Sequence, residues 1–305
     1  MFFKRSAGHV CDFAEKDALT ALFTQEYDGD EDSAAGGAIE THIHDEGIPY
    51  LPWRSGDFVF PQLLPFFDSA SYSQRLLKGL ITSAGGLTES TLKASSKTLF
   101  KYLSEMKDDI AKKSIFINKL IVIYEGNLHD ERVTIPLMKT IEMLLESGYL
   151  SENELVEDLK VLHALTVKEC NKSKNIVKLM GSVGVFSNML AYQDQDLVTK
   201  ALRSLLFLLY HTFPKVRDTT AQKLYTSLLS LEEYELIVPG GEDEYDEAVD
   251  MISETDWSLP TKVLRESTQA KFYAYFGQTV RAQPTAAAAT AAAKGGQDTE
   301  MVSTK

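Results

Sequence analysis

The chain has 305 residues, of which 44% are hydrophobic and 25% are charged, a balance typical of a folded globular protein. Its two cysteines, Cys11 and Cys170, form neither a disulfide framework nor a cysteine-rich zinc site, which fits a reducing cytosol. No stretch approaches the roughly 18 apolar residues of a membrane span, and the N-terminus lacks the apolar core of a secretory signal, so we expect a soluble intracellular protein.

The formal net charge of −13 is concentrated in two acidic segments. Residues 26–46 contain eight acidic and no basic residues, and residues 232–250 contain nine acidic and no basic residues. The rest of the chain has 27 acidic and 31 basic residues, so it is near neutral to slightly basic. Acidic runs of this kind are solvated loops more often than interaction tails. The remaining lysines alternate with apolar helix positions and form no basic stripe, which argues against a nucleic-acid partner.

The first part of the chain is polar and acidic, with one short predicted helix over residues 6–25. We predict that residues 1–43 form a disordered or unmatched N-terminal segment. Residues 47–67 are expected to be extended and packed on the body, because each proline removes a backbone donor and biases its predecessor toward extended geometry. The prolines are Pro49, Pro52, Pro61 and Pro65.

Helical periodicity dominates from Tyr72 onward. Glycines and prolines occupy the breaks between helices, for example Gly85-Gly86 and Pro239-Gly240-Gly241. No convincing alternating strand pattern is present, so the predicted fold class is all-α. The predicted helices span residues 73–84, 89–106, 112–125, 133–147, 152–170, 174–191, 195–211, 214–229, 244–253 and 258–276.

The stretch HTFPKVRDTTAQKLYTSLL, residues 211–229, follows a helical run and contains Pro214 near its start. This proline either kinks one long helix or begins a second helix that folds back on the first. Apolar residues recur at helical spacing on both sides, and proline suits the first turn of a helix but costs roughly 3 kcal/mol inside one. We therefore predict a helical hairpin, with Thr212 as a plausible N-cap of the second helix.

The spacing Pro-x-Val-Arg-x-x-x-Ala-x-x-x-Leu at this point is typical of the turn and second helix of HEAT-type repeats. A similar but weaker pattern at residues 129–148 places Arg132 at the start of another apolar stripe. Arg132 and Arg217 are 85 residues apart, about two periods of the roughly 40–47 residues of HEAT or armadillo units. These features predict a HEAT/armadillo-type helical-repeat solenoid, and the alternative is an irregular helical bundle.

Signals for catalysis or for bound groups are weak. The stretch SAGGLTES, residues 83–90, lacks the Gly-Lys-Ser/Thr ending of a phosphate loop and is interpreted as a helix end. Residues 42–46, HIHDE, are of metal-ligating types but have no distant partner cluster. Cys170 is expected to be an ordinary buried thiol, although a lowered pKa beside Lys168 is the alternative. We predict no catalytic residue, no cofactor and no metal site.

Three residues are candidates for binding a partner: Arg132, Arg217 and Trp257. Either arginine could act as an arginine finger toward a GTPase, but in HEAT-type turns such an arginine usually pairs with a carboxylate of the neighbouring turn. Trp257 could anchor a partner, although packing between the last two helices is the favoured interpretation. The residues alone indicate a helical-repeat interaction protein and no more specific function.

Five stretches carry a resemblance to a known family, in matching order. They are AGGLTEST (84–91), NLHDERVTIPLMKT (127–140), NKSKNIVKLM with the following GVF (171–180 and 184–186), FPKVRDTTAQKLY (213–225) and ISETDW (252–257). Together they resemble the C-terminal part of the tubulin-folding cofactor D family. We therefore predict a helical-repeat domain over residues 44–277 and a low-complexity disordered tail over residues 278–305. Family members are longer, so the resemblance implies that the chain is a fragment or one piece of a split gene.

The resemblance implies a non-catalytic protein of the cytoplasm and cytoskeleton that acts after the cytosolic chaperonin. Family members bind β-tubulin, bring it together with α-tubulin, and help to release the assembled heterodimer. They also stimulate GTP hydrolysis by tubulin with other tubulin cofactors, and associate with an Arf-like small GTPase. The expected partners are therefore β-tubulin, the α/β-tubulin heterodimer, other cofactors and that small GTPase, with neither nucleic acid nor membrane. The alternatives are a generic helical-repeat scaffold fragment without its own tubulin-binding activity, and a hydrolase or GTPase in its own right.

Overall fold

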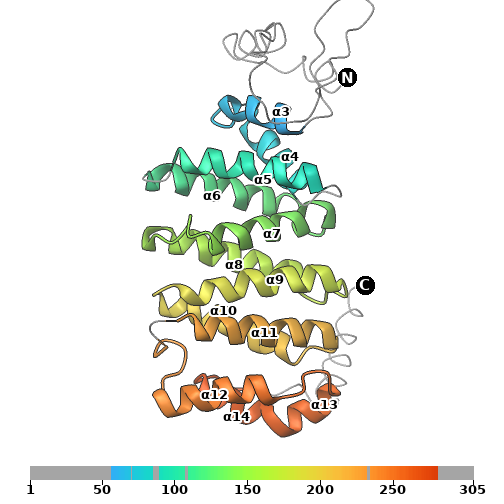
Figure 1. Ribbon diagram of the computed structural model, residues 1–305, viewed down its shortest axis with the longest axis vertical. Coiled ribbons are helices and arrows are strands. Elements are labelled where there is room, and N and C mark those ends of the chain that lie inside the picture. The colour runs from blue at the N-terminus through green and yellow to red at the C-terminus, as the bar shows by residue number, and fades with distance from the viewer. Residues whose placement is uncertain (1–55, 70, 85–88, 107–108, 232–233, 281–305) are drawn as a thin grey trace, which may run out of the picture.

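The computed structural model describes residues 56–69, 71–84, 89–106, 109–231 and 234–280, and every regular element among them is a helix (Figure 1). The all-α prediction is confirmed. The predicted helix over residues 6–25 and the first part of the predicted extended segment, residues 47–55, lie outside the described residues. Among the described helices, none has both the length and the apolar character that crossing a bilayer requires.

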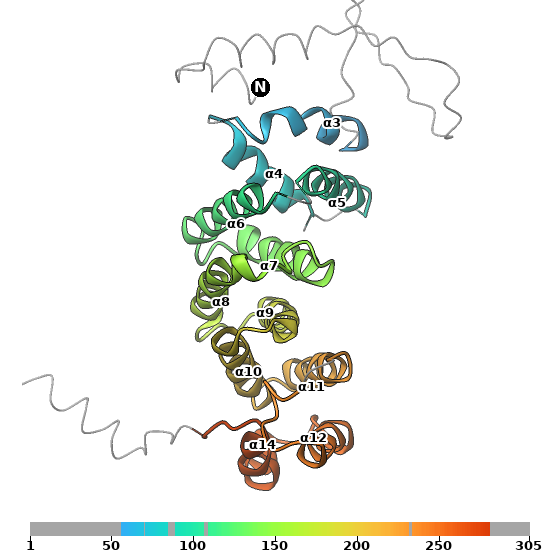
Figure 2. The same cartoon turned by 90° about the vertical axis from the view of Figure 1, so that its left-hand side faces the viewer.

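The helices stack in two columns. One column holds α5, α7, α9, α11 and α12, and the other holds α6, α8, α10 and α14 (Figure 2). A continuous apolar core lies between the columns, from Leu64 near one end to Phe276 near the other. The predicted helical-repeat solenoid is confirmed. In chain order the elements are α3 (Gly56–Gln62), η1 (Leu64–Phe66), α4 (Ser73–Ala84), α5 (Glu89–Ser104), α6 (Ile110–Glu125), α7 (Glu131–Glu146), η2 (Asn153–Leu155), α8 (Val156–Cys170), α9 (Ile176–Asn188), η3 (Met189–Ala191), α10 (Gln195–Leu209), α11 (Pro214–Leu229), α12 (Glu242–Glu254), α13 (Thr261–Leu264), the π turn η4 (Arg265–Gln269) and α14 (Ala270–Tyr275).

Pro214 begins a helix, as predicted. Helix α10 ends at Leu209 and α11 starts at Pro214, and the two helices pack against each other. The predicted N-cap is wrong: the capping position is Phe213, which is extended and makes no side-chain cap bond, because the residue before a proline is biased to extended geometry. The carbonyl oxygen of Thr212 instead accepts a hydrogen bond from Arg217 Nη1 at 3.2 Å.

Part of the proline-rich segment is helical, so the extended conformation predicted for residues 47–67 is wrong over residues 56–66. Pro61 lies in the last turn of the short helix α3, where it costs a single backbone hydrogen bond. Pro65 lies in the first turn of η1, where no backbone donor is required. The prolines therefore divide the helical structure into short pieces without preventing it.

The second acidic segment, residues 232–250, is helical only in part: residues 234–241 form turns and loop, and a helix begins at Glu242. Residues 242–254 form α12, which confirms the predicted helix over residues 244–253 and shows that the solvated-loop interpretation is wrong for them. Ala248 and Ile252 are buried and give the helix an apolar side. Three acidic residues occupy its first turn, where negative charge interacts favourably with the partial positive charge of the helix N-terminus.

Gly184 on α9 leaves room for a side chain of α7, whereas Gly181 makes ordinary contact with its neighbour. An ideal Cβ on Gly184 would lie 2.1 Å from Cδ of Glu142 on α7, and a Cβ on Gly181 would lie 3.6 Å from Cβ of Met138. The stack bows, and α5, α7, α9, α11 and α12 lie on its concave side (Figure 2). Helix α9 packs more closely against α7 and α11 than α8 packs against α6 and α10, which agrees with this direction of bending.

The second column is held to α9 by a buried histidine. His163 of α8 is 6% exposed, and its ring lies 5.0 Å from the ring of Phe186 on α9. Its Nε2 atom is 3.0 Å from the hydroxyl of Ser204 on α10. Burial lowers the pKa of His163 from 6.5 to about 4, because the positive form loses its hydration inside the core.

Replacing His163 with glutamine should therefore reduce the loss of stability on acidification. Between pH 6.5 and about 4 the unfolded state binds a proton that the folded state does not, so wild-type stability falls as the pH falls through this window. The full effect of this one group is on the order of 3 kcal/mol, and it is absent above pH 6.5. Urea denaturation at pH 7.5 and pH 4.5 measures the difference. The control Ser204→Ala should keep the wild-type difference, because burial is the main cause of the lowered pKa. Equal differences for wild type and His163→Gln would contradict the prediction.

Candidate partner-binding surface

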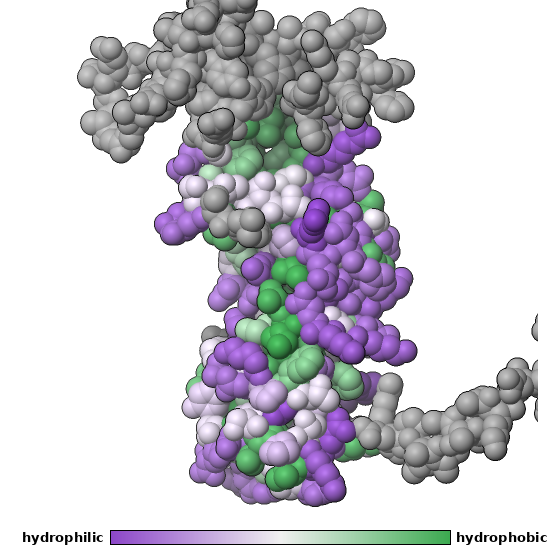
Figure 3. Space-filling view, turned by 90° about the vertical axis from the view of Figure 1, so that its right-hand side faces the viewer, coloured by the Kyte–Doolittle hydropathy of each residue, from purple (hydrophilic) through white to green (hydrophobic). Residues whose placement is uncertain are grey.

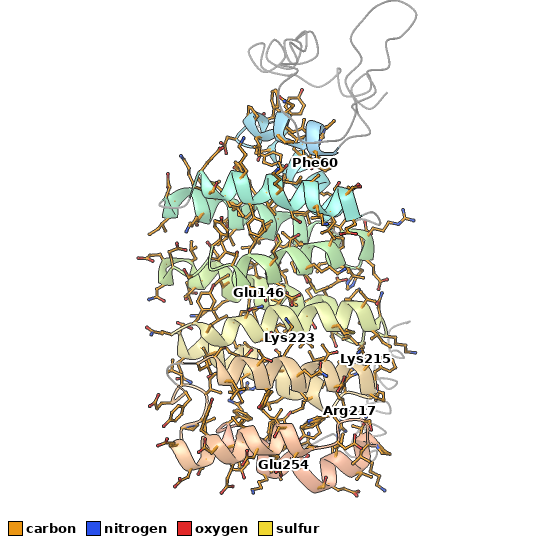
Figure 4. All side chains as sticks on the ribbon, in the orientation of Figure 1. Phe60, Glu146, Lys215, Arg217, Lys223 and Glu254 are labelled. Atoms are coloured by element: carbon orange, nitrogen blue, oxygen red, sulfur yellow. The ribbon has the colours of Figure 1, made fainter. Side chains whose placement is uncertain are left out.

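Arg217 lies inside the stack, near the end where the α10–α11 turn lies (Figure 4). Its side chain is 1% exposed and connects two turns of the solenoid. Nη1 donates to the carbonyl oxygen of His211 at 2.8 Å, in the α10–α11 turn. Nε donates to the carbonyl oxygen of Trp257 at 2.8 Å, and Nη2 donates to that of Leu259 at 2.6 Å, both in the α12–α13 turn. Additional acceptors at 3.2 Å are the carbonyl oxygens of Thr212 and Ser258 and the hydroxyl of Thr261.

These acceptors overturn the prediction of a carboxylate partner for Arg217. Burial lowers the pKa of the guanidinium below its usual value, but an arginine remains charged in proteins. Carbonyl dipoles around all the donor positions compensate a buried charge without a second ion. Arg217 therefore acts as a structural clamp between the last two layers of the stack.

Trp257 packs beside that clamp, as the favoured interpretation predicted. It is 6% exposed, and its ring lies 5.9 Å from the ring of Tyr210 and 6.1 Å from that of Phe272. Its indole Nε1 donates to the carbonyl oxygen of Ile252 at 2.9 Å. The structure thus brings Trp257 and Arg217 together. Whether either residue contacts a partner stays a prediction.

Arg132 lies apart from these two residues. It is exposed in the first turn of α7, and its backbone N–H donates to Oδ1 of Asp130 at 3.1 Å. The α6–α7 turn is two turns away from the α10–α11 turn along the same edge of the stack. Of the three candidates, only Arg132 presents its side chain to solvent, and its role in partner binding stays a prediction.

A buried ionic network at the α8–α9 turn was missed by the sequence reasoning. The carboxylate of Glu169 is fully buried and accepts hydrogen bonds from Lys178 Nζ at 2.5 Å and Thr134 Oγ1 at 3.0 Å. It also accepts from the backbone N–H of His129 at 2.7 Å, which connects α8 to the preceding turn. Burial alone would lower the pKa of Lys178, but hydrogen bonds to Glu169 and Glu131 raise it. The sequence feature that could have predicted this network is a glutamate at the end of one helix followed by Asn-x-x-Lys at the start of the next.

The hydrogen-bond cluster around Arg217 and the ionic network around Glu169 lie along one edge of the stack. The turns α6–α7, α8–α9, α10–α11 and α12–α13 follow one another there (Figure 1). Hydrophilic residues cover most of this edge, and hydrophobic residues form a narrow strip along it (Figure 3). The clusters hold successive layers in register, so the edge supports the shape of the adjacent concave face.

The concave face combines charged residues with one groove. Exposed lysines Lys139 on α7 and Lys215 on α11 lie on this column, and Lys223 of α11 forms an ion pair with Glu142 of α7 at 3.0 Å. A groove of about 690 Å³ opens between α11 and α12. Ala221, Tyr225, Ile252 and Trp257 contribute its apolar lining, and Lys215, Asp218 and Asp256 place charges of both signs at its rim. A curved, charged face of this kind suits a folded protein partner better than a small ligand.

The outer column offers a second candidate surface, which is apolar. Ile115 and Val122 on α6, Val161 on α8 and Phe207 on α10 are large apolar side chains that remain 40–68% exposed. Isolated exposed apolar residues are common on soluble proteins, whereas their occurrence on three neighbouring helices of one column makes this side a candidate contact surface.

Chemistry for catalysis is weak in the part of the chain that the structure describes. Among those residues, no group of three or more histidine, cysteine or acidic side chains could hold a metal ion. The candidate ligands of residues 42–46 lie outside them. Cys170 is half-buried, and burial raises the pKa of its thiol to about 11, which contradicts the alternative of a lowered pKa.

Comparison with known proteins identifies one family. The family model described as tubulin folding cofactor D C terminal matches residues 14–178, a little over half of the chain. The match begins within residues 1–43, which the sequence analysis left unmatched, and it includes Arg132 but neither Arg217 nor Trp257. No solved structure matches the chain.

Proposed function

Because the chain belongs to the tubulin folding cofactor D C-terminal family, we propose that it binds β-tubulin and helps to assemble and release the α/β-tubulin heterodimer after the chaperonin step. The family match is the observation that carries this proposal. The HEAT-type solenoid supports it, since stacked repeats form an extended concave surface that can receive a folded protein.

Two exposed lysines of the concave column are compatible with this client, whereas α12 at the end of the same column is acidic and is not. Tubulin is an acidic protein, and Lys139 and Lys215 are exposed on α7 and α11. Complementary charge steers association and suppresses wrong partners more than it raises affinity. We propose that these two lysines contribute to the client surface, and that the groove between α11 and α12 lies at its margin.

The proposed role in GTP hydrolysis is one of positioning. The chain would stimulate tubulin GTPase alongside other tubulin cofactors, with the catalytic groups supplied by tubulin and those cofactors. It would act without a cofactor of its own, in the cytoplasm and in association with the cytoskeleton. An Arf-like small GTPase is a further proposed partner.

Size-exclusion chromatography of the full chain with purified tubulin heterodimer tests the proposal. We expect co-elution at micromolar concentration. The double variant Lys139→Glu/Lys215→Glu should lose co-elution, because it places negative charge opposite an acidic client. The matched control Lys112→Glu/Lys168→Glu makes the same change of net charge on exposed positions of α6 and α8, and it should behave as wild type.

A folded chain that fails to co-elute would contradict the proposal. Cooperative thermal unfolding followed by circular dichroism establishes that the sample is folded. That result would favour the second candidate function, a generic helical-repeat scaffold fragment without tubulin-binding activity of its own. Nucleotide turnover by the purified chain in the absence of tubulin would instead favour an enzyme.

A further inference from the structure

One hydrogen-bonded ion pair connects two helices that are separated by a third helix. Lys223 Nζ on α11 donates to Oε1 of Glu142 on α7 at 3.0 Å. Helix α9 lies between these two helices and packs against both. The pair therefore links alternate helices of the concave column, whereas the Arg217 and Glu169 clusters connect adjacent layers. Lys223 lies near the middle of the face that Figure 4 presents.

A glycine on the intervening helix makes room for this link. Gly184 lies within α9, and a Cβ added there would stand 2.1 Å from Cδ and 2.2 Å from Oε1 of Glu142. The carboxylate thus occupies the space of the missing side chain. Glycine is unfavourable inside a helix, so its presence here has a packing reason.

The link acts on the bending of the solenoid more than on its stability. In a stack of repeats, each layer contacts mainly its neighbours, so small rotations at successive interfaces set the curvature. A contact between α7 and α11 restrains the sum of two such rotations directly. The side chains of Glu142 and Lys223 are 22% and 40% exposed, and ion pairs near the surface contribute little to the free energy of unfolding.

We infer that Glu142, Lys223 and Gly184 form a clasp that holds α7 and α11 together across α9 and fixes the curvature with which the concave face receives its client. All three are positioning residues. The part of this inference that concerns the client rests on the proposed function, whereas the part that concerns curvature does not.

A charge-swap series in the full chain tests the curvature. Spin labels are attached at Glu146→Cys on α7 and Thr226→Cys on α11, both exposed positions, in a Cys11→Ser/Cys170→Ser background, and their distance is measured by pulsed electron paramagnetic resonance. Glu142→Lys and Lys223→Glu should each shift the distribution to longer distances, because like charges then face each other over α9. The double variant Glu142→Lys/Lys223→Glu should restore the wild-type distribution.

Two further variants test whether the clasp is the cause of the change in distance. Gly184→Ala should lengthen the distance as the single reversals do, because its methyl group displaces the Glu142 carboxylate, while the melting temperature changes little. The control swap Glu247→Lys/Lys271→Glu alters an interhelical pair of 3.3 Å within the last layer and should leave the distance unchanged. A double variant that fails to restore the wild-type distance would overturn the clasp.

Tubulin binding by the same unlabelled proteins separates positioning from direct contact. We expect the single reversals and Gly184→Ala to weaken binding by about fivefold or more, and the double swap to restore it. Restored distance without restored binding would mean that these side chains contact the client themselves, which overturns the positioning role. Absence of binding by wild type would overturn the proposed function alone, because the distance measurement involves no tubulin.

Discussion

Replacing Arg217 with alanine should lower the free energy of unfolding by about 3–5 kcal/mol. The substitution removes the shared donor of two turns and leaves carbonyl oxygens in the interior without their side-chain donor, among them those of Trp257 and Leu259. The effect should concentrate in the last layer, because α12 and α13 are joined by one of those turns. Chemical denaturation measures the loss, and hydrogen exchange of the amides in α12 and α14 locates it.

The matched control for Arg217 is Arg132→Ala. Arg132 is also an arginine in the first turns of a helix, but it is exposed, so its removal should change stability by no more than about 0.5 kcal/mol. Arg217→Lys should be intermediate, because lysine keeps the charge but cannot reach the separate acceptors with a planar fork. Similar losses for Arg132→Ala and Arg217→Ala would contradict the structural role.

The same variant decides between the two interpretations of Arg217. A structural clamp predicts that Arg217→Ala lowers the melting temperature, with any loss of GTPase stimulation following from the damaged fold. An arginine finger predicts loss of stimulation at an unchanged melting temperature. Thermal melts and tubulin GTP turnover with the other cofactors present distinguish these outcomes. The burial of Arg217 favours the first.

Replacing Glu169 with alanine should cost a comparable amount, about 3–5 kcal/mol. The substitution leaves the buried Lys178 ammonium without its closest anion, and it removes the acceptor for the His129 backbone N–H and one of two acceptors for the Thr134 hydroxyl. Removing one partner of a buried pair is far more costly than removing both, because an uncompensated charge remains. Denaturant unfolding monitored by circular dichroism measures the loss.

Two further substitutions sharpen the Glu169 prediction. Glu131→Ala removes the other carboxylate of Lys178, which lies 3.2 Å away and is 48% exposed, so it should cost at most about 1 kcal/mol. The double variant Glu169→Leu/Lys178→Met replaces both charges with apolar groups and should recover part of the stability lost in Glu169→Ala. A double variant less stable than Glu169→Ala would show that the charge of Lys178 is not the source of the cost.

The sequence by itself determined the fold class and the family. Helical periodicity and the breaks around it are local properties, so the hairpin at Pro214 and the helices around it could be predicted from a few turns of sequence. The same locality explains the errors at residues 56–66 and at Thr212. At residues 56–66, the conformation depended on the tolerance of short helices for prolines. At Thr212, it depended on which residue the chain geometry places at the capping position.

Only the tertiary structure decided how the layers are joined. Glu169 meets the turn that holds His129, and Arg217 meets the carbonyl oxygens of a turn about 40 residues further on, because these turns stack along one edge. A pattern within one helix cannot specify such a pairing, since it depends on the register between packed helices. The concave curvature has the same origin: it depends on the absence of a side chain at Gly184, together with two charges that only the stack brings within hydrogen-bonding distance of each other.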